Sequence, residues 1–222
     1  MPETLKAGAV IAAAGYGKRF GEKKQFKLLG RRPLLFHTLT PFLECDDISE
    51  IVVVVPEDDL ENTSRELASF TSAKPVKTVT GGAHRQDSVL NGCRALSGDV
   101  KIIAVHDAAR PFVTSDLISA TLNGCNAAEG CIAALPSKDT VKKVRGSQIQ
   151  KTLDRSTVWL AQTPQTFHRD ILVSALQQEM EATDEASMVE ALGGKVSVVE
   201  GPYSNFKITT KEDWTMAEKF LK

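Results

Sequence analysis

The chain has 222 residues and a mass of 24.1 kDa, which suffices for one large domain or two small ones. Its 27 Lys and Arg residues nearly balance its 28 Asp and Glu residues, leaving a formal net charge of -1. This balance excludes the basic excess that is typical of general nucleic-acid binders and of proteins that bind membrane surfaces. Any anion-binding site must therefore be local.

Neither the start of the chain nor its cysteines indicate export. The segment Met1–Lys6 is short and polar, and no apolar run approaches the roughly 18–20 residues of a membrane span, so we expect no signal peptide and no membrane association. The four cysteines form no C-x-x-C pair. We therefore expect free thiols in a reducing, cytoplasmic compartment.

Short apolar runs alternate with longer amphipathic stretches along the chain. The runs are Ala7–Ala14, Ile51–Val55, Val76–Val79, Ile102–Val105, Ile132–Leu135 and Val196–Val199. Because each run is apolar throughout, it predicts a strand covered on both faces, as in a parallel sheet. Helical patterns lie between the runs, after Pro33, at Asp58–Phe70, His84–Leu96 and Ser115–Glu129, and from the capping box at Thr210 to about Lys222. The alternation predicts an α/β fold with a doubly wound, mostly parallel, Rossmann-like sheet.

One polar stretch interrupts this alternation. Residues 139–144 and 148–153 are strand-like and flank Arg145-Gly146-Ser147, which predicts a β-hairpin. We expect it to project as an arm, at about residues 138–156, from a single domain that spans residues 1–222. An isolated two-stranded hairpin is marginally stable in water, so the arm is expected to pack on something, such as a second subunit.

The loop after the first strand has the composition of a phosphate site. Between Ala12 and Gln25, small residues and glycines let backbone N–H groups approach a phosphate chain, while Lys18, Arg19, Lys23 and Lys24 supply positive charge. The loop matches neither the P-loop pattern nor G-x-G-x-x-G, because Phe20 stands where the third glycine would be.

Two further loops follow predicted strands at the same edge of the sheet, where ligands bind in open α/β folds. They are Gly81–Val89 and His106–Pro111. Asp107 directly follows a buried strand and could hold Mg²⁺ together with substrate phosphates, since that ion needs only one or two protein carboxylates. The structural alternative is that Asp107 caps the next turn and pairs with Arg110.

Taken together, the motifs resemble one family. The glycine loop Ala12–Arg19, the Lys24-Gln25 pair, G-G-x-x-R-x-x-S-V at 81–89 and H-D-A-A-R-P at 106–111 are similar to those of the 2-C-methyl-D-erythritol 4-phosphate cytidylyltransferases. Further matches lie at 138–140, 154–155, 162–165, 183–187 and 205–209, so the resemblance covers nearly the whole chain. Two positions depart from the family pattern: Lys23 replaces a usual proline, and Ala83 replaces a common acidic residue.

The resemblance implies cytidylyl transfer from CTP to a polyol phosphate, a divalent cation such as Mg²⁺ as cofactor, and a homodimer whose arms exchange. The implied catalytic residues are Arg19, Lys24, Arg155 and Lys207. The implied nucleotide-binding residues are Ala13, Ala14, Gly15, Gly17, Gly82, Arg85, Ser88 and Ala108. The implied acceptor-binding residues are Arg110, Thr140 and Thr163, and the implied metal ligand is Asp107. Arg155 would then act across the dimer, at the site of the partner subunit.

Other functions remain open from the sequence. The nearest is cytidylyl transfer to D-ribitol 5-phosphate, which shares these motifs; use of UTP or of another sugar phosphate is a further one. A non-catalytic nucleotide-sensing module would keep the fold but need not keep Arg155 and Lys207. A dinucleotide dehydrogenase would place an acidic residue directly after the second strand, where the chain has Pro56-Glu57.

Overall fold

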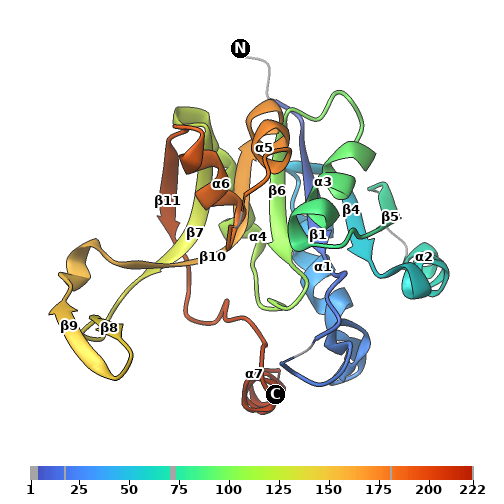
Figure 1. The fold of residues 1–222 in the computed structure, drawn as a ribbon. Coiled ribbons are helices and arrows are strands. Elements are labelled where there is room, and N and C mark those ends of the chain that lie inside the picture. Colours follow the sequence, from blue (N-terminus) through green and yellow to red (C-terminus); the bar gives the residue numbers. More distant parts are fainter. Residues whose placement is uncertain (1–4, 18, 71–73, 181, 222) are drawn as a thin grey trace.

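The computed structural model describes residues 5–17, 19–70, 74–180 and 182–221. Its centre is a seven-stranded sheet of order β11-β7-β10-β6-β1-β4-β5 (Figure 1). The strands are β1 (Ala7–Ala12), β4 (Ile48–Val55), β5 (Val76–Thr80), β6 (Ile102–Asp107), β7 (Gly130–Pro136), β10 (Trp159–His168) and β11 (Val196–Glu200). Each predicted apolar run forms one of these strands, and these strands run parallel. The predicted doubly wound, mostly parallel sheet is confirmed.

The antiparallel strand β10 was not predicted. It lies between β6 and β7 and pairs with both. Its sequence contains Gln162, Thr163, Gln165 and Thr166, and all four are buried. Their side chains are hydrogen-bonded; for example, Thr166 Oγ1 donates to Thr121 Oγ1 at 2.9 Å. These hydrogen bonds replace the ones that the polar groups would make with water, so the strand can bury them. A strand that buries polar residues lacks the apolar run on which the prediction relied.

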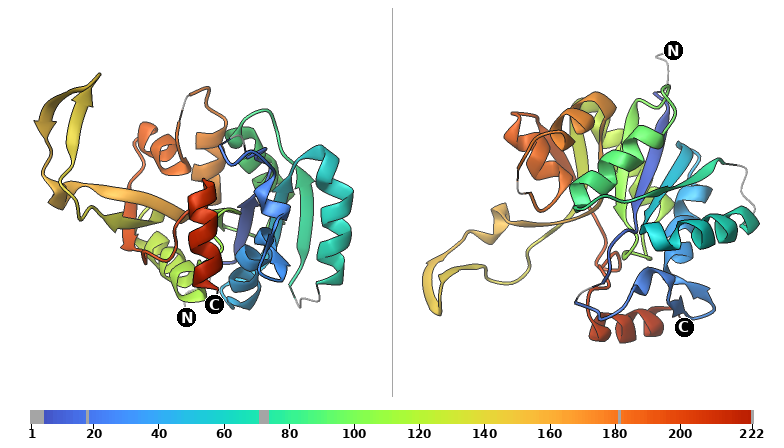
Figure 2. Two further views of the ribbon diagram at one scale, coloured as in Figure 1. Left: turned by 90° about the horizontal axis from the view of Figure 1, so that it is seen from below. Right: turned by 45° about the vertical axis from the view of Figure 1, so that its right-hand side comes forward.

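Helices cover both faces of the sheet (Figures 1 and 2). One face packs against α1 (Leu34–Glu44), α2 (Leu60–Ser69) and α4 (Ser115–Gly124). The other face packs against α3 (Arg85–Ala95), α5 (Arg169–Leu176) and α6 (Glu185–Ala191). Two predicted helices are shorter than expected, because 3-10 turns occupy their ends, η2 (Glu57–Asp59) before α2 and η3 (Cys125–Ala127) after α4. Within the described ranges, none of the helices is long and apolar enough to cross a membrane.

The C-terminal helix α7 (Lys211–Phe220) lies at the carboxyl edge of the sheet rather than on either face (Figure 1). Its predicted capping box is present, with Thr210 and Asp213 bonding each other's backbone N–H groups. Trp214 packs on Phe20 with ring centroids 5.5 Å apart, beside the short elements η1 (Lys24–Phe26), β2 (Leu28–Leu29) and β3 (Arg32–Pro33). This packing brings the end of the chain close to the first loop. Lys222, the expected end of this helix, lies outside the described residues.

The predicted hairpin is also confirmed. Strands β8 (Lys142–Arg145) and β9 (Gln148–Thr152) form a separate two-stranded sheet, followed by the turn η4 (Arg155–Thr157). All residues of both strands are exposed, and the hairpin projects from the body of the protein (Figures 1 and 2).

Candidate active site

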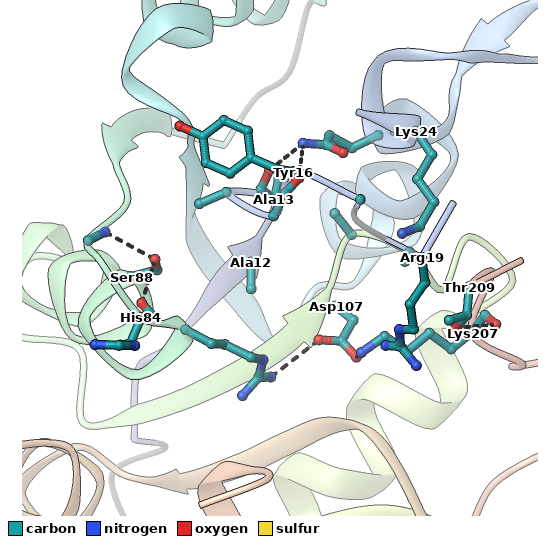
Figure 3. A pocket seen from close by; sticks show the side chains of 18 of the residues that line it. Ala12, Ala13, Tyr16, Arg19, Lys24, His84, Ser88, Asp107, Lys207 and Thr209 are labelled. Carbon is teal, nitrogen blue, oxygen red and sulfur yellow. Dashed lines mark hydrogen bonds and ion pairs between the residues drawn. The ribbon is translucent and has the colours of Figure 1, made fainter. Parts of the chain in front are cut away.

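The carboxyl ends of three neighbouring strands coincide. Ala12, the last residue of β1, is level with Val54 of β4 and with Asp107 of β6. Val55 of β4 is in turn level with Thr80, the last residue of β5. The loops that leave β1, β5 and β6 meet at this edge and line a cavity of about 410 Å³ (Figure 3). The predicted site residues that line it are Ala13, Ala14, Gly15, Gly17, Arg19, Lys24, Gly82, Arg85, Ser88, Asp107, Ala108 and Lys207.

The glycine loop is held by its backbone and by one glutamine. Gly17 has a φ of +64°, and a Cβ there would lie 2.0 Å from the carbonyl oxygen of Glu22, so this position requires glycine. The buried Gln25 amide donates to the carbonyl oxygens of Ala13 at 2.8 Å and of Gly15 at 2.9 Å. These bonds fix the loop that faces the cavity. Lys18, expected to add positive charge here, lies outside the described residues.

Arg19, Lys24 and Lys207 gather at one side of the cavity (Figure 3). Burial lowers the pKa of Lys24 below its ordinary value, and the nearby charges of Lys207 and Arg19 lower it further. Lys23 is directed elsewhere, because its Nζ pairs with Asp59 Oδ2 at 2.6 Å. The structure thus places Lys24, rather than Lys23, at the cavity.

The start of α3 forms the opposite wall. The Gly82 N–H group donates to Ser88 Oγ at 3.1 Å, and Ser88 Oγ donates to the His84 carbonyl at 3.0 Å. A Cβ at Gly82 would lie 2.2 Å from the Cβ of Asp87, which excludes any larger residue from this close approach. Asp87 accepts from the His84 N–H group at 2.9 Å and completes a capping box. The positive end of the α3 dipole therefore lies beside the cavity.

Asp107 lies at the floor of the cavity among three cations. Its Oδ2 is 2.7 Å from Lys207 Nζ and 3.7 Å from Arg110 Nε, and its Oδ1 accepts from Arg85 Nη2 at 3.2 Å. Burial alone would raise the pKa of Asp107, but the charges of Arg85, Lys207 and Arg110 hold it far below its ordinary value. Asp107 is therefore ionised at any working pH.

Glu185 is a functional candidate that the sequence did not reveal. The segment 183–187 matches the family pattern, and within it Asp184 caps α6 by accepting from the Ser187 N–H group at 3.1 Å. Glu185, the next residue, is buried, and its Oε1 accepts from Arg85 Nη1. Spacing along the chain gives no sign of this pair, because 100 residues separate its members.

Two predicted acceptor-binding residues lie around the cavity floor rather than on its lining. The Thr163 hydroxyl accepts from the Asp107 N–H group at 3.1 Å and donates to His106 Nδ1 at 2.9 Å. His106 Nε2 in turn donates to the Arg110 carbonyl at 3.1 Å. The Arg110 guanidinium donates to the carbonyl of Asn205 at 2.8 Å. In this chain, these contacts shape the loop that carries Asp107.

The other two predicted residues lie on the arm. Thr140 and Arg155 are exposed, and neither lines the cavity. Arg155 Nη1 donates to the carbonyl oxygen of Lys138 at 2.8 Å, so its side chain lies along the base of the hairpin. Within one chain, the arm and the cavity are separate.

The cavity has further lining residues that were not assigned from the sequence. They are Ala12, Tyr16, Gln25, Ala83, His84, Ala109 and Thr209. Most of them are next to a predicted site residue in the loop after β1, β5 or β6. That adjacency in the sequence is the one feature from which they could have been predicted. Thr209 comes from the segment that leads into α7.

The donor set limits how a metal ion could be held. No group of three or more His, Cys, Asp or Glu side chains is arranged for metal binding in the part of the chain that the structure describes. Asp107 is the single acidic side chain among the described residues that line the cavity. One carboxylate fits a Mg²⁺ ion that is held mainly by substrate phosphates and water.

Comparisons with known proteins agree with this geometry. A sequence profile described as 2-C-methyl-D-erythritol 4-phosphate cytidylyltransferase matches residues 7–222. The enzyme of that name from Syntrophotalea carbinolica is 43% identical, over 96% of this chain and 94% of the relative. The crystal structure of 4-diphosphocytidyl-2C-methyl-D-erythritol synthase from Anaerococcus prevotii matches with a TM-score of 0.88 and 31% identity over 99% of both chains. That of the cytidylyltransferase from Thermus thermophilus matches with a TM-score of 0.77 and 32% identity, over 96% of this chain and 98% of that one. The chain therefore belongs to the 2-C-methyl-D-erythritol 4-phosphate cytidylyltransferase family.

Proposed function

We propose that this chain transfers the cytidylyl group of CTP to 2-C-methyl-D-erythritol 4-phosphate, forming 4-diphosphocytidyl-2-C-methyl-D-erythritol and pyrophosphate. The observation that carries the proposal is the arrangement of Arg19, Lys24 and Lys207 beside the glycine loop in one cavity. The names of the relatives agree with it. In the reaction, an acceptor phosphate oxygen attacks the α-phosphorus of CTP, and the bond between that phosphorus and the bridging oxygen to the β-phosphate breaks.

The reaction needs no general base. A phosphate monoester has a second pKa near 6, so the nucleophile is already ionised at neutral pH. The barrier lies in bringing a dianion up to a triphosphate, and cations that are fixed in place lower that barrier. Arg19 and Lys24 suit the charge that develops on the α-phosphate and on the leaving pyrophosphate. Lys207 suits the acceptor phosphate.

The wall formed by α3 suits the cytosine base and the ribose. The Ser88 hydroxyl gives its proton to the His84 carbonyl and keeps capacity to accept a hydrogen bond. The exocyclic amino group of cytosine is a donor, whereas uracil has an acceptor at that position. A buried polar group left unpaired costs roughly 1–3 kcal/mol, so CTP is favoured over UTP.

We propose that Asp107 holds a Mg²⁺ ion together with the phosphates of CTP. When bound, the ion neutralises phosphate charge and so reduces the repulsion between the two substrates. Asp107 suits this role because it is ionised and lines the cavity. Arg85 and Lys207 balance its charge when no nucleotide is present.

We infer that the protein acts as a homodimer in which each arm completes the site of the partner subunit. Two observations support this: the hairpin is fully exposed, and the predicted acceptor-binding Thr140 and Arg155 lie outside the cavity of their own chain. Exposed apolar side chains on the arm and at its base, Val144, Ile149 and Leu160, would be covered by a second subunit. We also infer a cytoplasmic location, which the four free, buried cysteines support.

The proposed function is tested by comparing acceptors and nucleotides. Pyrophosphate release should give a far higher kcat/KM with 2-C-methyl-D-erythritol 4-phosphate than with D-ribitol 5-phosphate, and CTP should exceed UTP by at least about tenfold, or 1.4 kcal/mol. Preference for D-ribitol 5-phosphate would assign the sister activity instead. Tight CTP binding without turnover of any polyol phosphate would indicate a nucleotide sensor.

A further inference from the structure

A buried carboxylate lies behind the nucleotide wall. Glu185, the first residue of α6, is 1% exposed. Its Oε1 accepts from Arg85 Nη1, while its Oε2 has no hydrogen-bond partner among the described residues. Burial raises the pKa of Glu185 above its ordinary value, and the charge of Arg85 offsets only part of that effect. Burying a carboxylate that has one oxygen unpaired destabilises the folded chain, so we infer that Glu185 serves a function other than stabilising the fold.

The turn that carries Glu185 is anchored without the ion pair. Gln165 on β10 donates to Asp184 Oδ2 at 2.9 Å and accepts from the Ala186 N–H group at 3.0 Å. Asp184 also caps the helix through the Ser187 N–H group. Because neighbouring residues fix the backbone, the Glu185 side chain is not needed to begin α6. Among the side chains that the structure describes, Arg85 is the one that is hydrogen-bonded to Glu185.

Arg85 is shared between two carboxylates. Nη1 donates to Glu185, and Nη2 donates to Asp107 Oδ1 at 3.2 Å. Asp107 Oδ2 in turn lies 2.7 Å from Lys207 Nζ. Negative and positive side chains therefore alternate from the interior to the cavity, in the order Glu185, Arg85, Asp107, Lys207. The two carboxylates are buried, with side-chain exposures of 1% and 10%, whereas the side chains of Arg85 and Lys207 are 36% and 38% exposed.

This sharing fixes the guanidinium of Arg85 in one plane. A guanidinium has five N–H donors in a rigid fork and prefers to bind a single carboxylate through two of them. Glu185 holds one terminal nitrogen, so Arg85 meets Asp107 with only the other. Asp107 Oδ2 then remains available to Lys207, and Arg85 itself is one of the residues that line the cavity.

We propose that Glu185 is a positioning residue that orients Arg85 for CTP and prevents it from forming a two-pronged pair with Asp107. This inference rests on the proposed contact between Arg85 and the nucleotide. Glu185 touches neither substrate nor the reacting atoms. By holding one terminal nitrogen of Arg85, Glu185 determines where the positive charge of that guanidinium lies at the cavity.

The variant Glu185→Gln tests the proposal because it keeps the shape of the side chain and removes its charge. Glu190→Gln is the matched control, since Glu190 lies on the same helix and is exposed. CTP binding measured by titration calorimetry should weaken about tenfold in Glu185→Gln, which corresponds to about 1.4 kcal/mol. It should stay within twofold of the wild type in Glu190→Gln. An unchanged affinity in Glu185→Gln would overturn the proposal.

A double-mutant cycle with Arg85→Met separates positioning from general damage. If Glu185 acts through Arg85, then Glu185→Gln should change CTP affinity by less than twofold in the Arg85→Met background. A full tenfold loss in that background would overturn the proposal. If Arg85→Met alone binds CTP as the wild type does, the proposed nucleotide contact of Arg85 is wrong, and this inference fails with it. If Arg85→Met binds weakly but Glu185→Gln binds normally, only this inference fails.

The wild-type protein supplies a measurement that needs no folded Glu185 variant. With Nη1 and Nη2 held by different carboxylates, rotation of the Arg85 guanidinium should be slow, and its two Nη nitrogens should give separate ¹⁵N signals. Comparison with Arg85→Met assigns them. One averaged signal for Arg85 would show that the guanidinium is not fixed and would overturn the proposal.

Discussion

The separation of arm and cavity within one chain leads to a quantitative prediction about assembly. Arg19 lines the cavity, whereas Arg155 lies on the exposed arm with its guanidinium bonded to the Lys138 carbonyl. If each arm serves the partner's cavity, Arg19→Ala and Arg155→Ala damage the same composite site from different chains. Each variant alone should be nearly inactive, losing roughly 10²–10³ in kcat, as expected for removal of a fixed electrostatic group.

Mixing the two variants should restore activity. When equal amounts are unfolded and refolded together, about half of the dimers contain one chain of each kind. In a two-fold symmetric mixed dimer, one site carries both defects and the other carries neither. Half of the sites in half of the dimers are then intact, so the mixture should show about a quarter of the wild-type activity.

The assay is pyrophosphate release at saturating CTP and acceptor, with subunit exchange confirmed by native mass spectrometry of chains that carry different mass tags. Each variant refolded alone is the control for activity gained by refolding. If the mixture contains mixed dimers but stays as inactive as its parents, Arg155 acts on the cavity of its own chain and the shared-site proposal is wrong.

Three further predictions concern single residues. Lys24→Ala should lower kcat by roughly 10²–10³, whereas Lys23→Ala, which removes the pair with Asp59 and the contact with the Tyr16 ring, should be mild. The reverse order would contradict the placement of Lys24. Asp107→Asn should raise the Mg²⁺ concentration needed for half-maximal activity about tenfold with an unchanged circular dichroism spectrum, and an unchanged Mg²⁺ requirement would return Asp107 to a structural role. Burial lowers the pKa of His106 from its ordinary 6.5 to about 4, so the unfolded chain takes up a proton at a higher pH than the folded chain. The free energy of unfolding of the wild type should therefore fall by up to about 3 kcal/mol between pH 6.5 and pH 4. Urea titrations at several pH values should show that this contribution to the pH dependence is missing in His106→Gln.

The site loops were predictable because parallel strands end at a common edge. Once the apolar runs were recognised, Gly15, Gly82 and Asp107 had to lie near one another, since each lies at or just beyond the carboxyl end of a strand of the same sheet. The cavity confirms this proximity. Their roles in binding stay predictions.

The features that sequence patterns did not reveal depend on polar residues that are buried and paired over long distances. β10 escaped detection because it buries Gln162 and Gln165, which the pattern of apolar runs excludes. Glu185 escaped detection because its role depends on Arg85, which α3 and α6 bring together across 100 residues. Such pairs exist only after the sheet and its helices are in place.

The most direct test of the account follows the oxygen atoms of the acceptor. The protein is incubated with CTP and with 2-C-methyl-D-erythritol 4-phosphate whose phosphate carries ¹⁸O, and the products are analysed by ³¹P NMR and mass spectrometry. Attack of the acceptor phosphate on the α-phosphorus predicts one unlabelled pyrophosphate for each 4-diphosphocytidyl-2-C-methyl-D-erythritol formed, with all ¹⁸O retained in that product, including the oxygen that bridges its two phosphorus atoms. Appearance of ¹⁸O in pyrophosphate, or no diphosphate product from this acceptor in the presence of CTP and Mg²⁺, would contradict the proposed reaction.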